Sequence, residues 1–428
     1  MKKAMIMTVG TGRTGEDIAG ALAFSFKQQN PDELFLIVTP KSQEETLPYF
    51  QEKLKERGFP EDQCTVHHVQ EADDVEKLAL HYTKLIREII DKGFLSENIV
   101  ADYTSGTKAM SAALVLAGLS CAIGTLSYVI GDRGEGGRVI HGTERLFLLS
   151  PVKLRVEQGL RLARQMFNHY RFEACLDLTT DLQGRIGEPE LLGRIIFMHN
   201  LAKAYCFWDR FYLQDAFCCL KKLKDDPYLE AMGIKEKVFQ NFISVQNSKG
   251  DNNYYSLNRL VNIHQNARRR IEEGKYDDAT ARIYRLFEYM AQVRLKKKYN
   301  IKTKHLEVEK LPESFIRQEC LVADQHGKVS LGLQKAYRLL DHRRDALGQD
   351  FAVDYGSDNA PLKKLLDKRN SSILAHGFEP ISREDCTGLM QWAEKYLDKH
   401  FQGWWDLSRK AEFPRLPEGI GVEPVTFG

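Results

Sequence analysis

Residues 4–15 read AMIMTVGTGRTG, and this short stretch indicates the fold of the first third of the chain. An apolar run long enough for a buried strand passes into a glycine-rich loop, and residues 17–28 follow with the apolar spacing of a helix. Further apolar runs alternate with helical patterns of about 10 to 15 residues as far as residue 149. We therefore predict an α/β Rossmann-like domain over residues 1–150, with a parallel sheet that carries helices on both faces.

The loop after this first strand, residues 10–15, has the pattern GxGxxG, which in some α/β proteins cradles the pyrophosphate of a dinucleotide. Glycines let a phosphate approach the backbone, and the free amide groups at the start of the following helix attract an anion. A site for NAD also needs an acidic residue after the second strand, but that strand ends in Thr39, Pro40 and Lys41. We therefore disfavour a dinucleotide-dependent enzyme and expect either contact with another polyanion or a plain tight turn that requires glycine.

A second polar loop follows a later apolar strand, where residues 101–110 read ADYTSGTKAM. Its hydroxyl groups can donate hydrogen bonds, its lysine adds a positive charge, and a helix of small residues begins directly after it. The loop is not a Walker motif, because the earlier glycine of that motif is absent and the lysine follows the threonine. Ligands of open parallel sheets bind at the carboxyl ends of the strands. We therefore expect both loops to converge on one anion site rather than to serve as ordinary helix caps.

The composition limits the remaining classes of protein. The 428 residues include 61 Lys and Arg against 59 Asp and Glu, which excludes a uniformly basic nucleic-acid coat but not a local RNA-binding groove. Eight cysteines without a CxxC pair and an N-terminus without the features of a signal peptide lead us to expect a cytoplasmic protein with reduced thiols. Residues 109–131 contain no charged residue, but glycine and serine interrupt them, so we expect a buried helix and strand rather than a membrane span.

Beyond Pro151 the strand signals give way to helical periodicity. A polar segment at residues 247–253 is typical of a linker. We therefore predict three domains: the Rossmann-like domain at residues 1–150, an all-α linker domain at residues 151–253 and a second all-α domain at residues 254–428. The tail from Phe413 is rich in proline and glycine, and we expect it to be loosely ordered.

In the last domain, the periodicity predicts helices at residues 277–299, 333–347, 362–376 and 383–400. On the third of these, Arg369 and His376 lie two turns apart on one face, with Asn370 at its edge. Arginine can offset the charge of a phosphate transition state, and histidine can take or give a proton near neutral pH. These groups suffice for attack of a ribose 2′-hydroxyl on the adjacent phosphate of RNA without a metal ion. Arginine and histidine at this spacing also occur in helices where both are simply solvated, so the motif alone does not establish catalysis.

Together, these motifs resemble the CRISPR-associated accessory ribonucleases of type III systems. The resemblance depends on the loops at residues 10–15 and 102–110 and on the Arg369-Asn370…His376 motif, and the helix at residues 278–292 is similar to the first helix of the family's nuclease domain. Members of this family join a CRISPR-associated Rossmann-fold (CARF) sensor domain to a helical HEPN nuclease domain. The resemblance implies that residues 1–150 form the sensor and residues 254–428 the nuclease.

The resemblance also implies a function and its site residues. The sensor would bind a cyclic oligoadenylate as an allosteric activator, and the nuclease would then cut single-stranded RNA in antiviral defence, with no metal, no other cofactor and no membrane involved. The family works as a homodimer, in which the ring lies on the two-fold axis of the sensors and two Arg–His pairs form one nuclease site. Arg369, Asn370 and His376 would be catalytic. The ligand site would be lined by Gly10, Thr11, Gly12, Arg13, Thr104, Ser105, Gly106, Thr107 and Lys108.

Two other functions are compatible with the sequence. The first is a sensor or scaffold whose HEPN domain is inactive and which binds the cyclic ligand without cleaving RNA. The second is a sensor domain that also degrades its own ligand. For that reaction Thr11, Ser105 and Lys108 could polarise the ring phosphates, but the sequence offers no dedicated base.

Overall fold

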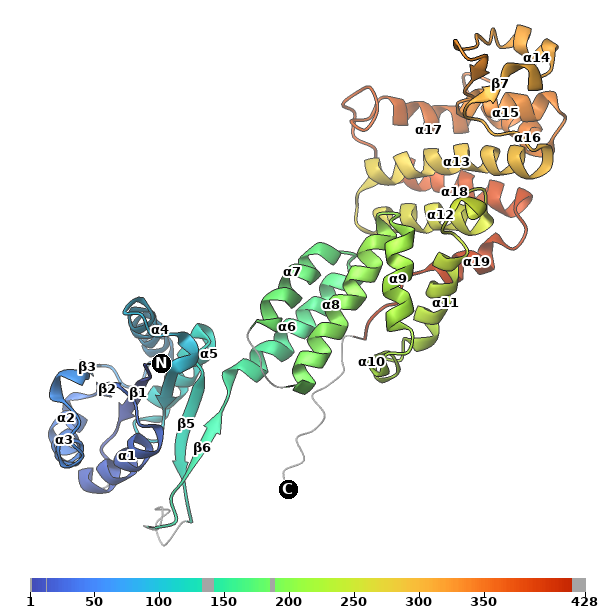
Figure 1. Ribbon diagram of the computed structural model, residues 1–428. Coiled ribbons are helices and arrows are strands. Elements are labelled where there is room, and N and C mark those ends of the chain that lie inside the picture. The colour runs from blue at the N-terminus through green and yellow to red at the C-terminus, as the bar shows by residue number, and fades with distance from the viewer. Residues whose placement is uncertain (1, 13, 133–141, 185–188, 418–428) are drawn as a thin grey trace. The chain divides into compact units, whose positions relative to one another are not determined.

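The computed structural model describes residues 2–12, 14–132, 142–184 and 189–417 (Figure 1). It divides into two compact units, of which the first is Met1–Gly159 with Arg185–Leu191 and the second is Leu160–Gly184 with Leu192–Gly428. The division of the helical part into a linker domain and a nuclease domain stays a prediction. Among the described helices, we find none with the length and hydrophobicity needed to span a bilayer.

The first unit is built around a six-stranded sheet in the order β3-β2-β1-β4-β5-β6. Strands β1 to β5 run parallel, and β6 pairs with β5 in the antiparallel direction. The strands are β1 (Ala4–Val9), β2 (Glu33–Val38), β3 (Cys64–His68), β4 (Ile99–Asp102), β5 (Thr125–Ile130) and β6 (Arg145–Leu149). The predicted Rossmann-like sheet is therefore confirmed.

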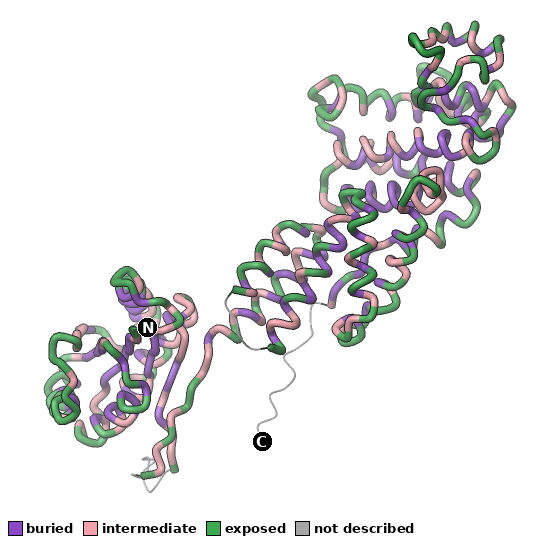
Figure 2. The backbone as a smooth tube through the Cα atoms, in the orientation of Figure 1, coloured by how far each residue is buried: buried purple, intermediate pink, exposed green. Residues whose placement is uncertain are grey.

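Helices cover both faces of this sheet, also as predicted, and its central strands are buried (Figure 2). The helices are α1 (Gly15–Gln29), α2 (Pro40–Glu45), α3 (Leu47–Glu56), α4 (Val75–Asp91) and α5 (Lys108–Cys121). The uncharged stretch at residues 109–131 thus forms most of α5 and all of β5, and α5 packs on the sheet.

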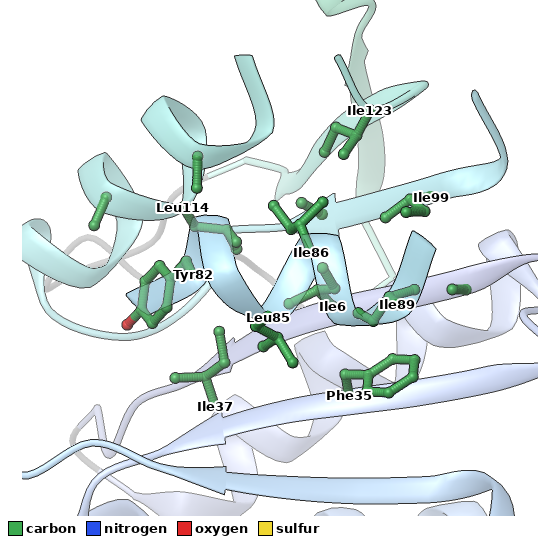
Figure 3. Close-up of a cluster of buried hydrophobic side chains, with 14 of the residues drawn as sticks. Ile6, Phe35, Ile37, Tyr82, Leu85, Ile86, Ile89, Ile99, Leu114 and Ile123 are labelled. Carbon is green, nitrogen blue, oxygen red and sulfur yellow. The ribbon is translucent and has the colours of Figure 1, made fainter. Parts of the chain in front are cut away.

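Successive residues of a strand point to opposite faces, so the sheet has one hydrophobic cluster on each face. These two clusters hold the helices against the sheet. On one face, Ile6 and Ile37 pack with apolar residues of α4 and α5, as Figure 3 shows. On the other face, Met7 and Leu36 pack with apolar residues of α1 and α3. The apolar runs of the sequence are continuous because their strands are covered on both sides.

The second unit is helical within the described residues, apart from a pair of two-residue strands, β7 (Leu306–Glu307) and β8 (Lys328–Val329). Helix α13 packs against α12, α15, α17 and α18. The helices that contribute to this unit are α6 (Pro151–Asn168), α7 (Phe172–Gln183), α8 (Pro189–Asp209), α9 (Leu213–Leu223), α10 (Pro227–Ala231), α11 (Lys235–Gln246), α12 (Leu257–Glu272), α13 (Tyr276–Tyr299), α14 (Glu313–Gln318), α15 (Leu333–His342), α16 (Ala346–Tyr355), α17 (Pro361–Asn370), α18 (Arg383–His400) and α19 (Trp404–Ala411).

The prediction of one helix over residues 333–347 is wrong, because two helices meet there. Helix α15 ends at His342, and Arg344 adopts a positive φ of 54°, which breaks the helix. Asp345 then caps α16 by accepting a hydrogen bond from the amide of Leu347 at 3.0 Å. An aspartate inside a helical pattern was the available signal for this break.

The expectation of a loosely ordered tail from Phe413 is wrong for residues 413–416. Phe413 is buried, and its ring centroid lies 4.7 Å from that of Tyr205 and 4.9 Å from that of Trp208. The side chain of Asn168 exchanges two hydrogen bonds of 2.8 Å with the backbone of Leu416. An aromatic ring with this much apolar area to bury outweighs the disorder expected from its proline and glycine neighbours.

Candidate functional site

Both predicted loops of the first unit lie at the carboxyl ends of adjacent strands, β1 and β4. The chain leaves β1 toward β2 and β3 and then returns to the other side of β1 as β4. The strand order therefore reverses between these two strands, and such a reversal leaves a crevice at the carboxyl ends where ligands of open α/β sheets bind. The structure brings the two loops together at this position.

The two loops touch through their backbones. A methyl group added to Gly10 would lie 2.4 Å from the amide nitrogen of Gly106, which is closer than any real contact. The amide of Gly10 also donates a hydrogen bond of 3.0 Å to the Ser105 hydroxyl. Gly106 has a φ of +106°, a conformation that other residues rarely adopt. Glycine is thus required on both sides of this contact.

The hydroxyl groups of the second loop serve the loop itself. Ser105 donates to the carbonyl of Thr8 at 2.7 Å, and Thr107 donates to the carbonyl of Ala72 at 2.6 Å. Thr104 accepts a hydrogen bond of 2.9 Å from the amide of Val129. The expectation that the hydroxyls of Ser105 and Thr107 donate to an anion is therefore wrong in this structure, because short bonds within the protein already use both protons. The sequence could not reveal these partners, which come from other segments.

Among the described residues of the two loops, the groups left to meet a ligand include backbone amides, the Thr11 side chain and Lys108. Helix α1 begins after its cap Thr14 and helix α5 after its cap Thr107, so the amino termini of both helices lie at this edge. Lys108 is exposed at the first position of α5, and Gly12 is exposed with a φ of +55°. Thr11 is half-buried. Arg13 lies outside the described residues. Unpaired amides at helix starts, together with a lysine, favour a phosphate.

The buried carboxyl group of Asp102 supports the loop after β4 through hydrogen bonds. Asp102, the last residue of β4, accepts hydrogen bonds from the Ser25 hydroxyl at 2.5 Å, the Ser127 hydroxyl at 2.9 Å and the Thr104 amide at 2.9 Å. Burial raises the pKa of this carboxyl, although its hydrogen bonds act in the opposite direction. Sequence reasoning missed Asp102 as a support for the site. An acid that ends a run of buried apolar residues was the signal that could have found it.

In the second unit, the prediction that Arg369 and His376 share one helix is wrong. Helix α17 ends at Asn370, and residues 371–376 form turns. The hydroxyl of the buried Ser372 donates to the carbonyl of Arg369 at 2.9 Å. Serine side chains compete in this way with the hydrogen bonds of a helix, which ends the helix here.

The chain then folds back on the end of α17. The amide of His376 donates to the carbonyl of Asn370 at 3.1 Å, and the amide of Glu379 donates to the carbonyl of Ser371 at 3.0 Å. Gly377 makes this return possible, since a methyl group there would lie 2.1 Å from the carbonyl oxygen of Ser371. His376 is therefore held next to Asn370 by a closed turn rather than by helical periodicity.

Arg369 is oriented by two neighbours. Its guanidinium lies over the ring of Tyr284 from α13, 4.5 Å from the ring centroid, and its Nη1 donates to the Asn370 Oδ1 at 3.3 Å. The preceding Lys368 forms an ion pair of 2.7 Å with Asp385 of α18. Arg369 is half-buried, whereas Asn370 and His376 are exposed. Asn370 thus connects the motif, through its side chain to Arg369 and through its carbonyl to His376.

The described parts of the chain contain no group of three or more His, Cys, Asp or Glu side chains placed to hold a metal ion. The chemistry that His376 and Arg369 can supply is proton transfer by an imidazole and stabilisation of negative charge by a guanidinium.

Comparison with known families identifies the helical part. Residues 157–249 match the family model of the Csm6 6H domain, and residues 247–400 match that of the Csm6 HEPN domain. The two matches meet and together span more than half of the chain. The chain belongs to the Csm6 family of CRISPR accessory proteins. The Arg369-Asn370…His376 turn lies inside the HEPN match, and the sheet domain in front of the 6H match has the CARF-like Rossmann fold.

The fold of the whole chain is also similar to that of a solved Csm6. "Enterococcus italicus Csm6 bound to cyclic hexa-2′-fluoro-hexa-dAMP" aligns over 96% of this chain and 98% of its own, with a TM-score of 0.62 and 12% sequence identity. At this identity, the likeness shows a shared fold. None of the curated protein sequences compared with the chain matches it.

Proposed function

We propose that this protein is an endoribonuclease of type III CRISPR defence. It cuts single-stranded RNA in its HEPN domain without a metal cofactor, and cyclic oligoadenylate bound to its CARF-like domain activates it. The observation that carries the proposal is the closed turn that holds His376 next to Asn370 and Arg369 within the segment that matches the Csm6 HEPN domain.

The proposed reaction uses the substrate's own nucleophile. The ribose 2′-oxygen attacks the adjacent phosphorus, the new O2′–P bond forms, and the P–O5′ bond breaks to leave a 2′,3′-cyclic phosphate and a 5′-hydroxyl. His376, whose side chain is exposed, takes the proton from the 2′-hydroxyl as the O2′–P bond forms and gives it to the departing 5′-oxygen. Arg369 offsets the charge that builds on the phosphate oxygens.

A homodimer fits the surface around this turn. Ile373, Leu374 and Phe378 are 65%, 49% and 90% exposed, so three apolar side chains face solvent next to the motif. Clustered exposed apolar residues commonly mark a protein interface. A second copy that covers them would bring two Arg369–His376 pairs together around one phosphodiester.

The activator site is proposed at the loops after β1 and β4. The solved Csm6 with the similar fold holds a cyclic hexa-adenylate analogue. In this chain, Gly10, Thr11, Gly12, Gly106 and Lys108 surround the amino termini of α1 and α5, where amides and a lysine favour ring phosphates. Arg13, Thr104, Ser105 and Thr107 complete the proposed lining, the last three mainly through their backbones.

The test uses a quenched fluorescent RNA in EDTA, with rings of different sizes added to the purified protein. We expect cleavage only with one ring size, and a loss of at least about 100-fold in Arg369→Ala and His376→Ala, because each removes a group that acts in the transition state. Ring binding, measured by calorimetry, is unchanged in both variants. Arg317→Ala and His326→Ala, which replace exposed residues outside the motif, keep full activity.

Two results would contradict the proposal, and a third would add a second reaction to it. Cleavage that persists in the Arg369→Ala/His376→Ala double variant excludes these catalytic residues. Ring binding without RNA cleavage under any condition supports the alternative of a sensor with an inactive HEPN domain. Linear product from labelled ring in the catalytic double variant assigns ring degradation to the CARF-like domain.

A further inference from the structure

Arg369 lies at the end of a helix, where few contacts hold its side chain. An arginine side chain has several rotatable bonds, and holding it in one orientation costs rotamer entropy. Its backbone position, the last turn of α17, leaves the guanidinium beside residues 371–376, which are not helical. Something other than the helix must therefore select one orientation if the guanidinium is to meet a phosphate reproducibly.

Hydrogen bonds alone do not select it. The Arg369 Nε is shielded from solvent and has no hydrogen-bond partner among the described residues. The guanidinium donates one hydrogen bond, of 3.3 Å, to the exposed side chain of Asn370. A single long bond to a solvent-exposed amide is a weak restraint.

The aromatic face of Tyr284 is a second contact of the Arg369 guanidinium. The carbon at the centre of the Arg369 guanidinium lies 4.5 Å from the centroid of the Tyr284 ring, within the range of a cation–π interaction. Tyr284 is half-buried on α13, which packs directly against α17, so the ring has a rigid base. Because Nε is turned inward and shielded, the terminal Nη groups are the edge that a phosphate can reach.

The hydroxyl of Tyr284 has no part in this contact. In the described part of the chain we find no hydrogen bond from the Tyr284 hydroxyl. Burial and the nearby Glu288 raise the pKa of Tyr284, so the phenol stays neutral around pH 7 and its ring remains an ordinary cation–π partner.

We propose that Tyr284 is the positioning residue of the nuclease site: the face of its ring holds the Arg369 guanidinium with the Nη edge toward the scissile phosphate. The inference rests on the proposed ribonuclease function and adds to it a residue on a different helix that touches no substrate. It also separates the role of the ring from that of the hydroxyl.

The test replaces Tyr284 by Phe and by Leu in the full-length, ring-activated protein. Tyr284→Phe keeps the aromatic face, and we expect its kcat to stay within about twofold of the original. Tyr284→Leu removes the face, and we expect kcat to fall about tenfold with KM unchanged, since an orientation needed only in the transition state affects kcat. Tyr276→Leu, a matched change of a half-buried tyrosine on the same helix, keeps kcat.

A second readout does not depend on activity. An arginine-specific dicarbonyl reagent, followed by peptide mass spectrometry, reports how accessible the Arg369 guanidinium is. We expect Arg369 to react several-fold faster in Tyr284→Leu than in the unchanged protein or in Tyr284→Phe. This result would stand even if the protein cleaved no RNA.

Two results would overturn the inference. If Tyr284→Leu keeps its kcat and its Arg369 reactivity, the ring does not hold the guanidinium. If Tyr284→Phe loses as much activity as Tyr284→Leu, the hydroxyl and not the ring face is required. If the unchanged protein cleaves no RNA, that result instead contradicts the proposed function. The labelling result then decides the role of Tyr284.

Discussion

At the scale of single residues, the Arg369-Asn370…His376 turn depends on one close approach of the backbone. His376 returns to Asn370 because Gly377 passes within contact distance of the Ser371 carbonyl, where no side chain would fit. The histidine is therefore placed by a glycine that has no chemical role of its own. The position of a catalytic imidazole is sensitive to such a support, since a shift of about 1 Å can cost 100-fold in rate.

Gly377→Ala tests this dependence. The added methyl group cannot be accommodated 2.1 Å from the Ser371 carbonyl oxygen, so the turn must open and His376 must move. We expect RNA cleavage to fall by about 100-fold while ring binding is retained. Gly332→Ala is the matched control, because a methyl group there meets no atom within 4 Å. Equal activity in the two variants would show that the turn does not position the histidine.

At the scale of elements, Asp102 joins three segments of the CARF-like domain. Its carboxylate oxygens bind Ser25 of α1, Ser127 of β5 and the loop amide of Thr104. Burial disfavours the charged form of the Asp102 carboxyl and therefore raises its pKa. Between the ordinary aspartate value of about 3.9 and the raised value, the unfolded chain releases a proton that the folded chain keeps. The free energy of unfolding therefore falls as pH rises through this window.

Asp102→Asn should remove this part of the pH dependence. The amide oxygen can still accept from the Thr104 amide, and its NH2 can donate to the two serine hydroxyls, so the variant should fold. We expect urea denaturation to show a free energy of unfolding for the variant that no longer falls as pH rises above about 4. Asp32→Asn, at an exposed position, serves as the control. An unchanged pH profile in Asp102→Asn would mean that this carboxyl is ionised as readily in the folded as in the unfolded chain.

The sequence predicted elements better than it predicted how they end. The strands and their parallel arrangement followed from apolar runs such as residues 4–9, because burial on both faces leaves a clear signal. The prediction of one helix over residues 362–376 was wrong. The Ser372 hydroxyl hydrogen-bonds the backbone in place of a helical bond, and a periodic pattern of apolar residues does not reveal this. Tyr284 was missed as a neighbour of Arg369, since contacts between helices distant in the chain leave no local pattern.

At the scale of the molecule, the segment around Phe413 contacts both the HEPN helices and the 6H helices within the second unit. Phe413 lies among Tyr205 and Trp208, and the guanidinium of Arg269 from α12 covers its ring at 3.7 Å. The amide of Asn241 from α11 donates to the carbonyl of Glu412 at 2.8 Å. Segments from both family-model matches thus meet on one short stretch of chain.

Phe413→Ala should destabilise the second unit markedly. Removing a buried phenylalanine typically costs about 3 to 5 kcal/mol, from lost burial and from the cavity left behind. We expect a loss of that order in chemical denaturation. Val322→Ala, at a side chain that is 88% exposed, should change stability by less than about 0.5 kcal/mol. A Phe413→Ala protein as stable as this control would show that the segment is only loosely attached.

The contact between Gly10 and Gly106 has a mechanical consequence for the proposed activator. No side chain separates Gly10 from Gly106, so at this contact neither loop can move toward the other. A ring that pushes on one loop must displace both, and with them the halves of the sheet that continue from β1 and from β4. The domain would then respond to its ligand as one rigid unit, whichever loop a phosphate contacts first.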